Sequence, residues 1–74
     1  MKSKFMALGR ADNDQNHPYI IDNATSFEEA AEKAAIVILK GQDEDWEGDI
    51  YIDCVTNQQF EYECNFAFDA NELR

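Results

Sequence analysis

Positive charge is scarce in the second half of this 74-residue chain, where Arg74 stands alone against ten Asp and Glu residues. Residues 1–40 carry five Lys and Arg against six Asp and Glu, so nearly all of the net charge of −10 belongs to residues 41–74. Phosphate backbones and anionic lipids repel such a surface. We therefore expect no direct binding to nucleic acid or membranes, and we expect a protein partner with a surface rich in Lys and Arg.

Long apolar runs are also missing. No stretch approaches the roughly 20 apolar residues of a membrane-spanning helix. The N-terminal sequence Met-Lys-Ser-Lys-Phe-Met-Ala-Leu-Gly-Arg has no apolar core of the kind found in signal peptides. We therefore expect a cytoplasmic location, where cysteines are kept as free thiols.

Residues typical of catalysis are few. The single histidine, His17, lies beside Pro18 in a polar segment, and only two cysteines, Cys54 and Cys64, are present. These residues suggest no pairing of a nucleophile with a base, and they make a poor zinc set. We expect a protein that is not an enzyme and that has no metal site and no cofactor.

One acidic segment resembles part of a calcium loop. Asp43, Asp45, Glu47 and Gly48 stand where positions 1, 3, 5 and 6 of an EF-hand loop would be. Position 12, which should be a bidentate Glu, is Cys54, and a strand is expected to follow the loop. The pattern argues against a dedicated calcium site and leaves weak binding at high calcium concentration as the alternative.

Apolar residues make up 45% of the chain, which is enough to predict a folded single domain over residues 1–74. The clearest element is a helix over about 26–40, where Ser26 and Glu29 form a capping box, with Thr25 and Glu28 as an alternative register. Its predicted apolar face comprises Phe27, Ala30, Ala31, Ala34, Val37 and Ile38.

Four segments read as strands: 4–10 and 19–22 before the helix, 49–55 and 59–68 after it. The pattern predicts an α+β fold, a small antiparallel sheet of about four strands in the order β-β-α-β-β, with one helix packed on one face. In the last two strands, alternation places apolar side chains at even positions, so even residues should pair with even residues.

A three-residue loop at 57–59 satisfies this rule, and it pairs Cys54 with Tyr62 and Ile52 with Cys64. The two thiols then share the core face without being opposed, so we expect them to be reduced and buried. The same register leaves an acidic strip on the outward face, formed by Asp53, Glu61 and Glu63 beside Tyr51.

The loop between the helix and the third strand is the second candidate binding surface. Trp46 is a candidate interface anchor there, and the alternative is that its ring folds back onto the core. The candidate partner-binding residues are therefore Asp43, Glu44, Asp45, Trp46, Glu47, Asp49, Tyr51, Asp53, Glu61 and Glu63.

In size, acidity, element order and lack of catalytic residues, the chain resembles the small inhibitors carried by phages and mobile elements, including anti-CRISPR and anti-restriction proteins that mimic DNA. The resemblance implies binding to a nucleic-acid-processing complex at a surface that normally holds nucleic acid. The nearly neutral first half departs from that pattern and would make such mimicry one-sided. The alternative is a structural or assembly role through self-association, such as a homodimer, or through a host protein.

Overall fold

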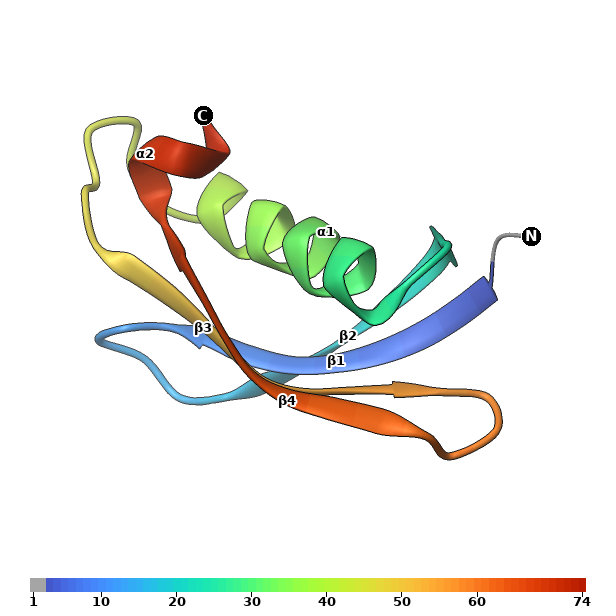
Figure 1. Ribbon diagram of the computed structural model, residues 1–74. Helices are drawn as coiled ribbons and strands as arrows, with labels where there is room; N and C mark the ends of the chain where they lie inside the picture. The colour runs from blue at the N-terminus through green and yellow to red at the C-terminus, as the bar shows by residue number, and fades with distance from the viewer. Residues whose placement is uncertain (1–2) are drawn as a thin grey trace.

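The computed structural model describes residues 3–74 and shows an α+β fold, as predicted (Figure 1). Its sheet has four antiparallel strands in the order β2-β1-β3-β4. Within the described residues, no helix is long and apolar enough to cross a lipid bilayer. The elements are β1 (Ser3–Ala11), β2 (His17–Ala24), α1 (Phe27–Lys40), β3 (Asp49–Asn57), β4 (Tyr62–Asp69) and the short α2 (Ala70–Leu73).

The capping box at the start of α1 is confirmed in the register of Ser26 and Glu29. The Glu29 backbone N–H donates to Ser26 Oγ at 3.1 Å, and the Thr25 backbone N–H donates to Glu29 Oε1 at 2.6 Å. At the other end, the Gly41 N–H donates to the Ile38 carbonyl at 3.1 Å. Both ends of α1 therefore form where the sequence predicts them.

Small side chains let α1 lie close on one face of the sheet (Figure 1). The prediction for Val37 is wrong, since 48% of its surface is exposed, and Ala35 is buried in its place. The buried stripe is centred on Ala31, Ala34 and Ile38, which puts Val37 on the outer side of the helix. Completely buried partners in the sheet are Ala7, Ala24, Ile50, Ile52 and Val55.

Gly9 lies in β1 directly beneath α1 and is buried. A Cβ atom at this position would be 2.5 Å from Ile52 Cδ1, 2.9 Å from the Tyr51 carbonyl oxygen and 3.3 Å from Ile38 Cδ1. The backbone oxygen cannot move without disturbing the ladder between β1 and β3. Any side chain here would overpack the contact between helix and sheet.

Replacing Gly9 by Ala should therefore lower the free energy of unfolding by about 1–3 kcal/mol. Urea denaturation followed by circular dichroism measures this change. Gly41→Ala is the matched control, because its Cβ would meet only the Ile38 carbonyl at 3.4 Å and its φ of −84° suits alanine. Equal midpoints for the two variants would contradict this account of Gly9.

In β3 and β4, the side chains switch from one face of the sheet to the other near Asp53. The predicted strict alternation is therefore wrong there. Ile52 and Val55 are both buried although their positions differ by an odd number. The ladder shifts between Leu8 and Gly9 and leaves Asp53 without a partner in β1. Opposite Asp53, Asn65 adopts a φ of 69°, a conformation that Asn tolerates better than most residues.

The register of this hairpin also differs from the prediction. The loop consists of residues 58–60 rather than 57–59, so Thr56 pairs with Tyr62 and Cys54 with Cys64. The Asn57 side-chain oxygen accepts the backbone N–H groups of Gln59 at 3.0 Å and Glu61 at 2.9 Å. This side chain fixes Asn57 as the first residue of the turn.

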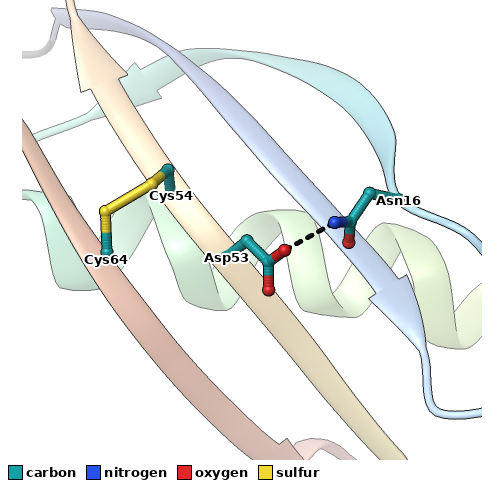
Figure 2. Close-up of a disulfide and its surroundings, with 4 residues drawn as sticks. All are labelled: Asn16, Asp53, Cys54 and Cys64. Atoms are coloured by element: carbon teal, nitrogen blue, oxygen red, sulfur yellow. Dashed lines mark hydrogen bonds between the residues drawn. A yellow bond between two sulfur atoms is a disulfide. The ribbon is translucent and has the colours of Figure 1, made fainter.

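Because the two cysteines are directly opposed, they form a disulfide between β3 and β4 (Figure 2). The prediction that Cys54 and Cys64 are reduced and buried is therefore wrong. Cys54 is half-buried and Cys64 is exposed. Figure 2 shows the disulfide on the side of the sheet nearer the viewer, with α1 behind the strands. The bond thus belongs to the face that the helix leaves uncovered.

Candidate protein-binding surfaces

One end of the molecule collects carboxylates from three segments that are distant in the sequence. The β1–β2 turn, the α1–β3 loop and the β4–α2 junction all lie at the end opposite the β3–β4 turn (Figure 1). We call this surface the acidic end, and all of its side chains are exposed: Asp12, Asp14, Asp43, Glu44, Asp45, Glu47, Asp49, Asp69 and Glu72.

Hydrogen bonds between the segments fix the acidic end. The Asp12 backbone N–H donates to the Asp49 carbonyl at 2.9 Å, and the Asp49 N–H donates back to Asp12 Oδ2 at 3.2 Å. Asp49 and Asp69 are partners across β3 and β4, and the Ala70 N–H donates to the Gly48 carbonyl at 3.2 Å. Carboxylates from both halves of the chain therefore share one surface.

This arrangement includes five predicted residues and four that the sequence analysis did not select. Asp43, Glu44, Asp45, Glu47 and Asp49 come from the predicted acidic loop. Asp12 and Asp14 come from the polar segment between the first two strands, and Asp69 and Glu72 follow the last predicted strand. The pairing of β1 with β3 brings the first turn beside that loop, and periodicity within single strands carries no signal for such pairing. The Asp-rich composition of the first turn was the only available hint.

Trp46 folds back toward the core, which is the alternative to a role as an exposed interface anchor. It is half-buried and packs against the core cluster, and its ring occupies the space where a Cβ of Gly48 would stand. Arg74 Nη2 donates to the Trp46 carbonyl oxygen at 2.6 Å. The ring therefore anchors the acidic loop to the body of the protein.

The predicted outward strip of Tyr51, Asp53, Glu61 and Glu63 is divided in the structure, so the prediction that it forms one surface is wrong. Tyr51 pairs with Arg10, whose guanidinium lies 4.9 Å from the ring centroid, on the face away from α1. Asp53 accepts a 2.5 Å hydrogen bond from Asn16 Nδ2, visible in Figure 2. Glu63 pairs with buried Val55 and so belongs to the helix side.

Glu61 closes the turn between β3 and β4 and belongs to neither face of the sheet. Its Oε1 accepts a hydrogen bond from Asn57 Nδ2 at 2.8 Å, and its carbonyl oxygen accepts the Asn57 backbone N–H at 2.9 Å. The change of faces at Asp53 is what separates Asp53 from Glu63.

The face of the sheet opposite α1, here called the open face, carries large apolar side chains. Met6 and Ile20 are partners across β1 and β2, as are Leu8 and Pro18. The exposed fractions are 48% for Met6, 38% for Leu8, 59% for Ile20, 67% for Tyr62 and 86% for Phe60. We call this group the apolar patch; it comprises Met6, Leu8, Pro18, Ile20, Phe60, Tyr62 and the Cys54–Cys64 disulfide.

Two adjoining hollows lie within the apolar patch. The first, of about 250 Å³, is lined by residues that include Met6, Ile20, Thr56 and Phe60. The second, of about 170 Å³, shares Met6 and Thr56 with the first and extends to Leu8, Pro18 and Cys54. Together they make the open face a grooved apolar surface. The alternation in the sequence does not predict it, because that alternation places Cys54, Tyr62 and Cys64 in the core.

The cations of the open face are already engaged by the chain itself. Lys4 Nζ lies 3.8 Å from Asp22 Oδ1, and Arg10 Nη1 donates to the Asp12 carbonyl oxygen at 3.0 Å. Over residues 3–74, no three His, Cys, Asp or Glu side chains come together in a way that could hold a metal ion.

Comparison with known proteins gives no match: no protein-family model, no curated protein and no solved structure is similar to this chain.

Proposed function

We propose that this protein is a non-catalytic, acidic inhibitor that binds the Lys- and Arg-rich surface of a nucleic-acid-processing protein, in the manner of anti-CRISPR or anti-restriction proteins. The observation that supports it best is the acidic end, where nine exposed carboxylates from three segments share one end of the fold. A basic groove that holds a phosphate backbone attracts such a surface by long-range electrostatics.

Several carboxylates must act together in this proposal. A single exposed ion pair contributes only about 0.2–1 kcal/mol and is screened by salt. Hydrogen bonds that link Asp12 with Asp49, and Gly48 with Ala70, hold the contributing segments together before any partner binds. A preformed cluster loses less conformational freedom on binding than a mobile acidic tail would.

Charge reversal at the acidic end tests the proposal. The triple variant Asp43→Lys, Asp45→Lys, Glu47→Lys should lose capture of nucleic-acid-processing proteins from a cell lysate at low salt. The unaltered protein should capture them at low salt, release them at high salt, and release them when duplex DNA is added as a competitor. Mass spectrometry of the captured proteins gives the readout.

A second triple variant controls for net charge. Asp22→Lys, Glu28→Lys, Glu32→Lys makes the same change in total charge at exposed positions away from the acidic end. We expect this variant to capture the same proteins as the unaltered chain. Equal loss in both variants, or retention in both, would overturn the role of the acidic end.

A structural or assembly role is the second candidate, and the apolar patch favours it. Monomeric proteins rarely leave several large apolar side chains together on one exposed face. In this reading the protein acts through self-association or through a host protein, and the carboxylates mainly keep the assembly in solution.

The proposed inhibitor acts in the cytoplasm, where its targets would be. Cytosolic glutathione and thioredoxin keep most cysteines reduced. The exposed Cys54–Cys64 bond is accessible to such reductants. The proposal therefore expects the protein to work with or without this bond, because the acidic end lies in other parts of the chain.

A further inference from the structure

We propose that the open face of the sheet is the interface of a homodimer, in which the apolar patches of two copies pack against each other. This inference concerns a different surface from the acidic end and does not depend on the proposed inhibition. Its starting point is the exposure of Met6, Ile20 and Tyr62, which lie in one row across the sheet, with Thr56 of β3 between Met6 and Tyr62.

The distribution of charge favours a second copy as the occupant. Around the apolar patch, the strand positions of the open face carry two cations, Lys4 and Arg10, and two acids, Asp22 and Asp53, so this part of the face is neutral on a protein of net charge −10. Asp49 and Asp69 are on the same face but belong to the acidic end. Lys4 is paired with Asp22, and Arg10 is held by a backbone carbonyl and the Tyr51 ring. The apolar patch offers no excess charge that would select a strongly charged partner, and packing two copies would bury no net charge.

The size of the open face indicates a weak dimer. Strands of eight or nine residues span about 28 Å, and four strands cover about 19 Å, so the face has an outline on the order of 500 Å². Specific interfaces begin near 600 Å² per partner. Phe60, which lies in the β3–β4 turn, adds exposed area at the hairpin end. The open face is therefore smaller than the interfaces of stable complexes, and it suits a weak, reversible dimer.

Repulsion between the acidic ends selects one arrangement of the two copies. The apolar patch lies toward the β3–β4 turn, whereas the acidic end lies at the other end of the strands. Consider a two-fold axis that lies in the plane of the interface, runs perpendicular to the strands and passes through the apolar patch. It places the two acidic ends at opposite ends of the dimer. Charges so far apart are screened at physiological ionic strength, where the Debye length is about 8 Å.

This dimer has a salt dependence opposite to that of the proposed inhibition. Burial of apolar surface does not weaken with added salt, and salt reduces the remaining repulsion between copies. We therefore expect self-association to increase with salt, whereas capture of a basic partner decreases. The two proposals can thus fail independently.

Sedimentation equilibrium of the full chain, from micromolar to millimolar concentration and at low and high salt, tests the inference. We expect a reversible dimer that is favoured by salt. Ile20→Lys should weaken it by at least about tenfold, because each dimer would then bury two ammonium groups without partners. Tyr62→Lys should have the same effect from a different strand.

Val37→Lys is the matched control, since Val37 is similarly exposed but lies on the outer side of α1. All three variants make the same change in net charge, and circular dichroism and a melting curve confirm that each is folded. A monomer at all concentrations would overturn the proposal. Dimers that Val37→Lys weakens as much as Ile20→Lys does, or that neither change affects, would also overturn it.

Discussion

Replacing Ile52 by Ala will lower the free energy of unfolding by about 2–5 kcal/mol. Ile52 is completely buried at the centre of β3, where it faces α1 and fills the space above Gly9. The smaller side chain leaves a cavity, and neighbouring β1 cannot move in to close it because its ladder with β3 fixes its position. In a chain of this length the loss is a large fraction of the total stability.

Chemical denaturation at several temperatures measures the change, with the slope of the transition used to check that unfolding stays cooperative. Val37→Ala is the control, because Val37 is half-exposed and its truncation should alter stability by no more than about 0.5 kcal/mol. An effect of Ile52→Ala as small as that of the control would mean that α1 does not pack on β3 as described.

Removing the disulfide is the second change with a large expected effect. The bond links residues ten apart. Closing a loop of this size lowers the entropy of the unfolded chain and so raises the free energy of unfolding by about 2.5–3 kcal/mol. The free energy of unfolding of the double variant Cys54→Ser, Cys64→Ser should be lower by this amount. Serine fits both positions because Cys54 is only half-buried and Cys64 is exposed.

Reduction of the unaltered protein with dithiothreitol should shift its denaturation midpoint to that of the double variant. The same treatment should leave the double variant unchanged, which controls for other effects of the reductant. A thiol assay on the oxidised, unfolded protein should find no free thiol. Free thiols in that assay would show that the bond does not form in solution.

The order and type of the elements could be predicted from the sequence because each depends on local signals. Ser26 and Glu29 cap α1 through contacts within one turn, and the alanines of the helix repeat with its period. The alternation of apolar residues after the helix is long enough to identify two strands. These features depend on nearest neighbours in the chain, and one helix on an antiparallel sheet follows from them.

The register of the last hairpin could not be predicted by parity alone. Loops at 57–59 and at 58–60 both keep even residues paired with even residues, and the second requires Phe60 to take a φ of 66°. Bulky residues rarely adopt that conformation. The hydrogen bonds that Asn57 accepts from Gln59 and Glu61 stabilise the turn, and an Asn at this position was the local signal for it.

The acidic end and the apolar patch were harder to predict, since both depend on tertiary structure. The ladder shift at Asp53 and the backbone conformation of Asn65 turn Cys54 and Cys64 away from α1, which converts a predicted core face into an exposed one. The acidic end needs β1 to pair with β3, which are separated by a hairpin and a helix. A single sequence gives no direct record of such contacts.

The central pairing of β1 with β3 also determines how the chain folds. Each outer strand joins its neighbour through a short turn, so the β1–β2 and β3–β4 hairpins can form locally within microseconds. The β1–β3 ladder must close a loop that contains β2, α1 and the acidic loop, and contacts so distant in sequence are slow to form. We therefore expect the joining of the two hairpins beneath α1 to limit the folding rate. Because the disulfide lies within one hairpin, oxidation preorganises that hairpin but does not shorten this loop.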